Sequence, residues 1–323
     1  MTGSARRSPG DWPTDPERRY AARQARFADE CGVAVESHTT DTDAAGRIHY
    51  LTAGPADGEP VVLLHGITEP AAIWMPVLSA LADRYRLYAP DMPGEGLSAK
   101  PSYSGRGLRT SLTAYLLELC DEWGIDRAHV VAHSLGGWQG FFLATDTEFV
   151  DRLCLVGAPV GLSRDFPLLV RLFTVRVVNR LLLWLMSRGD GVENARQWLD
   201  LFGVVDASAV PPGFLELYAT RQDLPGLQDS LRSLMTEAGS FGRMRPLTDR
   251  RSQIVDIERP TAFVWGSADY YWPPAVGRRV ARRMPDAEFH ELPEHGHTPW
   301  LEPGDEAATL VRSFLDAAAT DGR

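Results

Sequence analysis

The sequence of 323 residues has little cysteine and no metal-binding spacing. Its three cysteines are Cys31, Cys120 and Cys154, an odd number spread widely along the chain. Zinc sites and disulfide frameworks need closely spaced or paired cysteines, so we interpret these three as buried, reduced thiols. No group of His, Asp and Glu has the spacing of a metal site either. No nucleotide-binding motif is present, and we therefore predict no metal and no cofactor.

The chain also lacks an excess of basic charge. It contains 33 Lys and Arg against 43 Asp and Glu, which gives a net charge of −10. A general nucleic-acid surface requires a concentrated basic patch, so nucleic acid is not an expected partner. Hydrophobic residues make up 44% and charged residues 24%, as in a soluble globular protein. No internal repeat and no low-complexity tract is visible.

One long apolar stretch is present, at residues 167–187. Arg171, Arg176 and Arg180 interrupt it, which argues against a transmembrane span. We predict a lid helix that packs over an apolar cavity, with Asn179 on its narrow polar side. A helix on a membrane surface is the alternative, because basic residues opposite leucines are typical of that case too.

The first residues carry a basic pair but no apolar segment after it, so we expect no secretory signal and a cytoplasmic protein. Residues 1–14 are polar and rich in Pro and Gly, and we expect them to be disordered. Asp15-Pro16-Glu17 then predicts the start of a helix that ends at Gly32.

From residue 60 the pattern alternates between strands and helices, which predicts an α/β fold with a mostly parallel sheet of eight strands. Short apolar runs covered on both faces are expected at 61–64, 86–89, 130–131, 152–156 and 262–265. Helices are expected at about 72–83, 107–123, 136–145, 275–284 and 304–319. Helical spacing without a clear strand fills the region from 161 to 255.

This pattern predicts three parts of the chain. Residues 1–40 form an N-terminal extension, partly disordered and with one helix. Residues 41–160 and 256–323 form the α/β core. Residues 161–255 form a helical cap or lid inserted between two strands of the sheet.

The pentapeptide Ala132–Gly136 follows a predicted strand and precedes a predicted helix. A small-x-Ser-x-Gly sequence at such a junction is a nucleophile elbow, which holds the serine hydroxyl above the sheet edge. A serine hydroxyl cannot attack an ester unaided, so Ser134 requires a histidine base and a carboxylate that orients it.

Asp269 and His297 follow Ser134 in the order that such sites use. Asp269 comes after a buried strand and a glycine turn, at the carboxyl end of the sheet. Its alternative role is the N-cap of the next helix. We prefer His297 to His295 as the base, because Gly296 lets the loop turn and the proline at 299 then rigidifies it. We expect His290 to be a surface residue.

Two further histidines lie beside the predicted site without a predicted role in proton transfer. His133 precedes the serine, and we expect its side chain to turn into the protein interior. His65 is expected to brace its loop by hydrogen bonds. Two backbone N–H groups must stabilise the developing oxyanion. The predicted donors are Leu135, at a helix N-terminus, and Ile67, in the loop after the strand at 61–64.

These motifs together resemble the α/β-hydrolase superfamily, in the branch with a serine nucleophile and a helical cap. The matching segments are His65-Gly66 with Trp74, Asp91–Ser98, the Ser134 elbow, Trp265–Asp269 and Gly296–Pro303. The resemblance covers residues 60–318. It implies Ser134 as nucleophile, His297 as base and Asp269 as orienting acid, with Asp91–Ser98 as a structural loop.

The resemblance also limits the chemistry. A serine nucleophile excludes epoxide hydrolases and haloalkane dehalogenases, which use aspartate there. The loop after His65 lacks the Gly-rich extension of carbon–carbon bond hydrolases, and the elbow lacks their Asn-Ser-Met. We therefore expect a carboxylic ester or lactone hydrolase for small apolar substrates, held by Trp138, Trp184 and Tyr270. The alternatives are thioester, amide or carbon–carbon bond hydrolysis, acyl transfer, perhydrolysis, or a non-catalytic ligand receptor.

Overall fold

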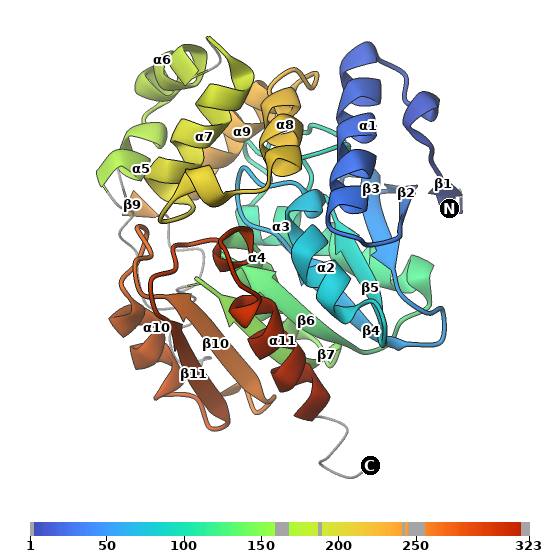
Figure 1. Cartoon of the computed structure of the whole chain (residues 1–323), viewed down its shortest axis with the longest axis vertical. Helices are drawn as coiled ribbons and strands as arrows, with labels where there is room; N and C mark the ends of the chain where they lie inside the picture. Colours follow the sequence, from blue (N-terminus) through green and yellow to red (C-terminus); the bar gives the residue numbers. More distant parts are fainter. Residues whose placement is uncertain (1–2, 159–167, 187–188, 241–242, 245–255, 318–323) are drawn as a thin grey trace.

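The computed structural model describes residues 3–158, 168–186, 189–240, 243–244 and 256–317. Within them a nine-stranded sheet runs through the molecule, in the order β1-β2-β3-β5-β4-β6-β7-β10-β11 (Figure 1). Its strands are β1 (Ala5–Arg6), β2 (Val35–Thr42), β3 (Gly46–Ala53), β4 (Glu59–Leu64), β5 (Tyr85–Pro90), β6 (Ala128–His133), β7 (Val150–Val156), β10 (Thr261–Gly266) and β11 (Ala287–Leu292). The strands from β5 to β11 in this order pair in parallel, and β1, β2 and β3 are antiparallel.

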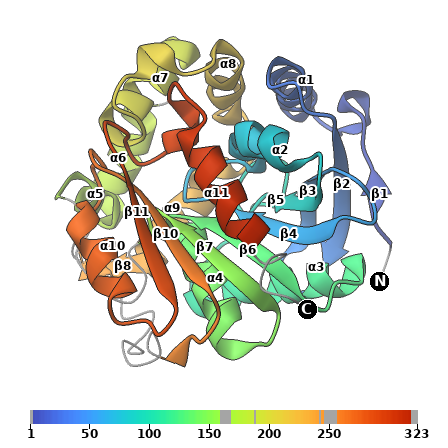
Figure 2. The same ribbon diagram turned by 60° about the horizontal axis from the view of Figure 1, so that its bottom comes forward.

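Helices cover both faces of the sheet, because successive side chains of a buried strand point to opposite sides. In β4, Val61 and Leu63 lie in one core cluster with the apolar faces of α2 and α11, whereas Val62 and Leu64 lie in another with α3, α4 and α10. The helices are α1 (Asp15–Glu30), α2 (Met75–Leu81), α3 (Leu108–Trp123), α4 (Leu135–Asp146), α10 (Pro274–Ala281) and α11 (Glu306–Asp316). Figure 2 shows α2 and α11 side by side on one face.

Between β7 and β10 the chain forms an insertion that is mostly helical. It contains α5 (Leu168–Phe173), α6 (Arg176–Met186), α7 (Gly191–Phe202), α8 (Pro212–Arg221), α9 (Leu227–Ala238) and the two-residue strands β8 (Gly239–Ser240) and β9 (Arg243–Met244). We predicted no clear strand in this region, and the antiparallel pair of β8 and β9 corrects that prediction. Two-residue strands are too short to give a periodic signal in the sequence. Residues 159–167 and 245–255 of the predicted insertion lie outside the described residues.

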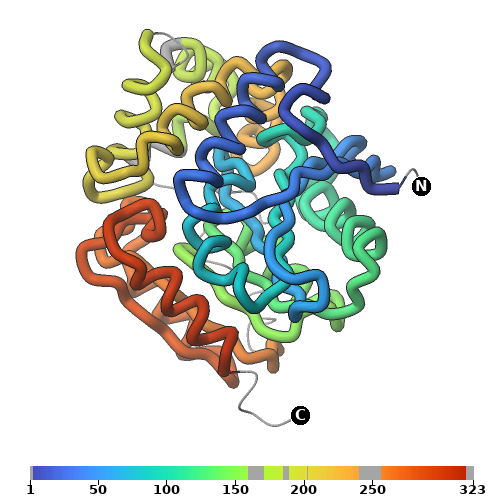
Figure 3. Tube along the Cα trace, turned by 45° about the vertical axis from the view of Figure 1, so that its right-hand side comes forward, coloured from blue at the N-terminus to red at the C-terminus, as the bar shows by residue number. Residues whose placement is uncertain are grey.

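The N-terminal segment is ordered where we expected disorder. Ala5 and Arg6 form β1, which pairs with β2 and brings the sheet to nine strands rather than eight. Helix α1 begins as predicted, with the Thr14 side chain accepting a hydrogen bond from the Glu17 N–H. Figure 3 shows α1 alongside the insertion, where Phe27 contacts Phe214 of α8. The pairing of β1 with β2 gives a defined place to a segment whose composition alone indicated a flexible tail.

The apolar stretch at 167–187 also differs from the prediction. It forms two helices, α5 and α6, instead of one, with a turn at Thr174-Val175. The side chain of Asn179 donates to the carbonyl oxygen of Phe173 at 2.5 Å, and so satisfies the end of α5. Asn179 is completely buried, whereas we predicted it on a polar face. No described helix is both long enough and apolar enough to span a membrane.

Candidate active site

Ser134 sits at the sharp turn between β6 and α4. Its backbone has φ 51° and ψ −114°, a strained conformation for a residue with a side chain. Its N–H donates to the carbonyl oxygen of Val156 at 3.0 Å, which fixes the turn against β7. The turn brings α4 so close to β4 that a Cβ on Gly136 would lie 2.2 Å from the carbonyl oxygen of Leu64. Only glycine fits there, which explains the last position of the pentapeptide.

Asp269 and His297 form a buried hydrogen-bonded pair after β10 and β11. The Nδ1 of His297 lies 2.8 Å from the Oδ2 of Asp269. The other carboxylate oxygen accepts the N–H groups of Tyr271 at 2.8 Å and Trp272 at 3.2 Å. Asp269 is therefore held from both sides, and its contact with Nδ1 fixes the orientation of the His297 ring. The alternative role of Asp269 as an N-cap of the next helix does not account for its bond to His297.

Gly157 connects this pair to the serine turn. A Cβ placed on Gly157 would lie 2.9 Å from the Nδ1 of His297 and 3.3 Å from the Oδ2 of Asp269. Gly157 directly follows Val156, to which the backbone of Ser134 is bonded. The structure thus brings the three residues that we predicted as a triad to the carboxyl end of the central strands.

The loop that carries His297 is anchored by a buried carboxylate. Glu302 accepts the N–H of Gly296 at 2.7 Å with one oxygen and the N–H of Val205 at 2.6 Å with the other. The N–H of Thr298 donates to the carbonyl oxygen of Gly203 at 2.8 Å. The loop is therefore bonded to the end of α7 in the insertion. Burial raises the pKa of Glu302, although these two hydrogen bonds favour its ionised form.

The predicted oxyanion donors lie on the two segments next to Ser134. Leu135 is the first residue of α4, where an N–H has no partner within the helix. Gly66 approaches the serine so closely that a Cβ there would lie 3.0 Å from the Cβ of Ser134. Ile67 follows Gly66, and its side chain packs against the cluster of Phe173, Leu231 and Met235 in the insertion. The backbone of the loop is thus beside the serine, and its side chain is held by α5 and α9.

His65 braces this loop, as predicted. Its Nε2 accepts the N–H of Met92 at 2.9 Å, so its proton is on Nδ1, which donates to the carbonyl oxygen of Gly66 at 2.8 Å. His295 is less suitable than His297 as a base, since its Nδ1 faces the carbonyl oxygen of Pro293 at 2.7 Å.

A buried carboxylate that we did not predict lies in the same loop. Glu69 accepts the N–H of Gly66 at 2.6 Å and faces the Nδ1 of His133 at 2.8 Å. Burial would raise the pKa of Glu69, but His133, His297 and His65 outweigh it and lower the pKa below its ordinary value. The only signal in the sequence was an acidic residue four positions after His65.

The loop from Asp91 to Ser98 is a structural loop next to the site and is held by buried hydrogen bonds. Asp91 is fully buried and accepts the N–H groups of Ala71 at 2.6 Å and Leu97 at 2.8 Å. Its Oδ2 lies 2.6 Å from the Nδ1 of His49. Burial opposes its ionisation, yet His49 and these bonds lower the pKa of Asp91 to about 2. Lys100 closes the loop by donating to the carbonyl oxygens of three of its residues, including Gly96 at 2.8 Å.

The same loop carries a buried ion pair to the insertion. Arg221 at the end of α8 donates to Glu95 through two nitrogens, one at 2.9 Å. The other oxygen of Glu95 accepts the N–H of Thr68 at 3.2 Å. Thr68 has φ 65°, an uncommon value for a residue with a side chain. The insertion, the Asp91 loop and the predicted oxyanion loop are therefore joined through one carboxylate.

A cavity of about 30 Å³ lies next to His297, under the insertion. It is lined by Thr68, Glu69, Ile73, Trp198, Leu199, Gly203, Phe214, Tyr218, Tyr271, His297 and Thr298. The ring of Tyr271 lies against that of His297, with centroids 4.4 Å apart. Burial raises the pKa of Tyr218, and raises that of Tyr271 far above its ordinary value, so both phenols are neutral donors at neutral pH.

The three aromatic residues predicted to hold substrate do not line this cavity. Trp138 of α4 is buried in a core cluster, with its ring against those of Phe141 and Phe142. Trp184 of α6 and Tyr270 are 46% and 45% exposed. The lining comes instead from Trp198 of α7 and from Phe214 and Tyr218 of α8, whose positions depend on how the insertion packs.

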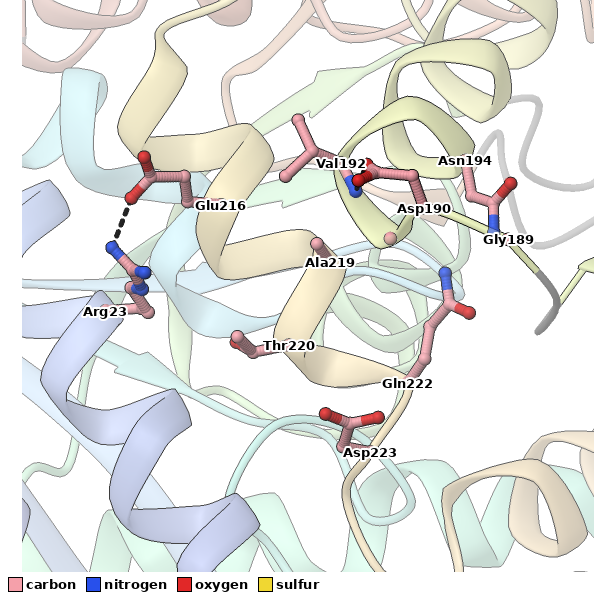
Figure 4. Close-up of a pocket in the computed structure, with 11 residues that line it drawn as sticks. Arg23, Gly189, Asp190, Val192, Asn194, Glu216, Ala219, Thr220, Gln222 and Asp223 are labelled. Carbon is pink, nitrogen blue, oxygen red and sulfur yellow. Dashed lines mark hydrogen bonds and ion pairs between the residues drawn. The ribbon is translucent and has the colours of Figure 1, made fainter.

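A second depression, of about 370 Å³, lies between α1, α7 and α8 (Figure 4). Arg23 is paired with Glu216 across it, and Asp190 caps α7 by accepting the N–H groups of Val192 and Glu193. Its lining shares no residue with the cavity at His297. The part of the chain that the structure describes contains no group of three or more His, Cys, Asp and Glu that could hold a metal ion.

Comparison with known proteins agrees with the fold and the elbow. The sequence pattern described as "Alpha/beta hydrolase family" matches residues 61–310. The chain is 31% identical to a 2-hydroxy-6-oxononadienedioate/2-hydroxy-6-oxononatrienedioate hydrolase of Burkholderia vietnamiensis, over 83% of this chain and 91% of that protein.

Solved structures resemble the chain over most of its length. A carboxylesterase from Bacillus subtilis matches with a TM-score of 0.74 and 19% identity, covering 94% of this chain and 99% of that one. A meta-cleavage product hydrolase from Pseudomonas fluorescens matches with a TM-score of 0.68 and 26% identity, covering 84% and 95%. The chain belongs to the α/β-hydrolase family, and the serine at its elbow agrees with the serine-nucleophile branch.

Proposed function

We propose that this protein is a serine hydrolase in which Ser134, His297 and Asp269 form the catalytic triad. The observation that carries the proposal is the buried hydrogen bond between Asp269 and His297, next to a serine on a strained turn. Asp269 holds the ring so that Nε2 takes the proton of the Ser134 hydroxyl, and the serine attacks a carbonyl carbon. The N–H groups of Leu135 and Ile67 stabilise the oxyanion that forms.

The region from 161 to 255 acts as a cap in this proposal, inserted between core segments 41–160 and 256–323. Trp198, Phe214 and Tyr218 of the insertion lie over the cavity at His297. The cavity has room for about one water molecule. Substrate therefore enters only when the cap helices move away from the core. Closure then removes water from the reacting carbonyl, as in other lidded sites.

The relatives favour hydrolysis of a carbon–carbon bond over that of an ester. Their names give 2-hydroxy-6-oxononadienedioate and 2-hydroxy-6-oxononatrienedioate, both dicarboxylates, as substrates. In such a compound Ser134 forms a bond to the ketone carbon, and the adjacent carbon–carbon bond breaks. The electron pair delocalises into the unsaturated fragment, which takes its proton from His297. Water, deprotonated by His297, then releases the acyl group from Ser134 as a carboxylic acid.

Ester hydrolysis is the second candidate, and the cavity lining favours it. Glu69 is the only acidic side chain among the lining residues, and neither Lys nor Arg is among them. A dicarboxylate would meet this carboxylate in a water-poor site, where like charges repel strongly. The loop after His65 also lacks a Gly-rich extension. A neutral acyl group, from an ester or an aryl ketone, suits this lining better.

Two measurements test the proposal. A fluorophosphonate probe is expected to label Ser134 in the wild type and to leave the Ser134→Ala variant unlabelled. Turnover is then compared for the dienedioate, its monoacidic phenyl ketone analogue and p-nitrophenyl esters of short acids. Dienoic acid cleavage that is lost in Ser134→Ala supports carbon–carbon chemistry, and ester turnover alone supports the second candidate. No labelling and no turnover of any of them contradicts a serine hydrolase.

A further inference from the structure

Helix α6 exposes apolar side chains that a globular protein normally buries. Val177 is 83% exposed, Leu181 54% and Trp184 46%. Their spacing of four and three residues places them on one stripe of the helix. Of the eight large exposed hydrophobic residues among those described, these three share one helix face. An exposed apolar stripe of this kind indicates a surface that is covered in use.

The opposite side of α6 is already packed against the protein. Asn179 is fully buried and bonded to the end of α5. Leu182 and Leu183 lie against the cluster of Phe173, Leu231 and Met235. One apolar side of α6 therefore packs against the rest of the insertion, and a second apolar side is exposed to solvent. Its exposed stripe is not the underside of the lid that the sequence predicted.

Two arginines border the stripe. Arg176 and Arg180 are exposed, and Trp184 follows Arg180 at the same spacing of four residues, so the arginine row meets the apolar stripe at Trp184. The segment from Leu168 to Met186 contains three arginines and no acidic residue, in a chain whose net charge is −10. Positive charge is thus concentrated beside the apolar stripe although the chain as a whole is acidic.

We propose that this α6 face, formed by Arg176, Val177, Arg180, Leu181 and Trp184, docks on an anionic lipid surface. Aliphatic side chains enter the edge of the acyl region, a tryptophan lies at the headgroup level, and arginines meet the lipid phosphates. A second copy of the chain fits less well, because a symmetric contact would place the two arginine rows against each other.

The docked helix would lie close to the proposed active site. Leu182 and Leu183 share their cluster with Ile67, which carries one of the proposed oxyanion donors. Apolar substrate dissolved in a bilayer would therefore be delivered beside the cap. Docking itself does not depend on the proposed chemistry, so binding and turnover are measured separately.

The test is flotation of the full chain with vesicles of phosphatidylcholine alone and of phosphatidylcholine with phosphatidylglycerol in equal parts. We expect at least tenfold stronger binding to the anionic vesicles, weakened by salt. The variants Val177→Asp/Leu181→Asp and Arg176→Glu/Arg180→Glu are each expected to lose it. The matched control is Leu117→Asp, at a leucine 39% exposed on α3, which should bind like the wild type.

Several outcomes would overturn this proposal. Absence of binding to anionic vesicles excludes a lipid surface, and equal binding of all variants places the contact elsewhere. A concentration-dependent dimer in light scattering that Leu181→Asp dissolves would identify a second copy as the partner. Because all of these substitutions are at exposed positions away from the cavity, turnover of a soluble substrate should be unchanged in each variant, which verifies folding independently of vesicle binding.

Discussion

His133 and Glu69 form a buried pair beside the proposed nucleophile, with Nδ1 and Oε2 2.8 Å apart. The other ring nitrogen of His133 faces the carbonyl oxygen of His297 at 2.9 Å. A carbonyl oxygen can only accept, and the Glu69 oxygen already accepts the N–H of Gly66. Both ring nitrogens of His133 therefore face oxygen atoms, one on each side of the ring. The pair connects the proposed oxyanion loop to the backbone of the proposed base.

The variant Glu69→Gln tests this positioning role. Both contacts are made by one oxygen of Glu69, so the amide oxygen of glutamine can replace it but carries no charge. A hydrogen bond to a charged group contributes about 1.5–3 kcal/mol, and a neutral one only about 1 kcal/mol. We expect kcat to fall by about tenfold to a hundredfold with KM for a small ester little changed. In nitrogen-15 NMR, the Nδ1 resonance of His133 should shift in Glu69→Gln. An unchanged His133 signal would contradict the contact between the two side chains.

Replacing Ser134 by glycine should stabilise the fold while it abolishes turnover. A side chain at φ 51° and ψ −114° carries roughly 1–3 kcal/mol of strain, and glycine relieves it at an entropic cost of about 0.5–1 kcal/mol. We expect a net gain of about 1 kcal/mol in the free energy of unfolding, measured in urea. Ser134→Ala is the matched control, because it removes the hydroxyl but keeps the Cβ. Equal stability of the two variants would mean that the turn stores no strain.

The ion pair between Arg221 and Glu95 is buried and bonds the insertion to the core. Removal of one partner leaves an uncompensated charge, so Arg221→Met and Glu95→Gln should each cost about 3–5 kcal/mol. The double variant should cost much less than the sum. Arg312→Ala, which breaks a surface pair with Asp83, should cost less than about 1 kcal/mol. Additive costs in the double-mutant cycle would show that the two residues act independently.

Asp91 should make stability depend on acid pH. The pKa of this carboxyl is about 2 in the fold and 3.8 ordinarily, so the unfolded chain binds the proton first as the pH falls. The contribution, about 2 kcal/mol, is complete above pH 4 and is lost between pH 4 and pH 2. Unfolding free energies of wild type and Asp91→Asn, compared by urea titration at successive pH values, should converge over this range. A constant difference would contradict the ionised state.

Local patterns in the sequence were sufficient for the core and for the candidate triad. Strands such as β4 are buried on both faces, so each forms an unbroken run of apolar residues that can be recognised in the sequence. Ser134, Asp269 and His297 each follow a strand at the same end of the sheet, so chain order alone brings them together. The family assignment and the α/β fold are confirmed, whereas the roles of these residues stay predictions.

The features that the sequence did not predict depend on packing between distant segments. Trp198 and Tyr218 line the cavity because α7 and α8 lie over His297, and helical periodicity does not specify which helix covers which loop. Periodicity also misplaced Asn179, which we predicted on the polar side of the helix. Its side chain is buried and bonded to the carbonyl oxygen of Phe173, and the apolar stripe of α6 is exposed instead.

Lys100, which closes the Asp91 loop, is the only lysine among the 323 residues. Its three carbonyl contacts enclose the ammonium, and burial lowers its pKa to about 8. Apart from the α-amine, the Lys100 side chain is therefore the single amine that an acylating reagent can modify. The folded loop shields this amine from the reagent. The rate at which that amine is acylated, followed by intact-mass spectrometry, reports how often this loop opens. The acylation rate of Lys100 thus measures the opening rate of the Asp91–Ser98 loop beside the proposed active site, without an introduced label.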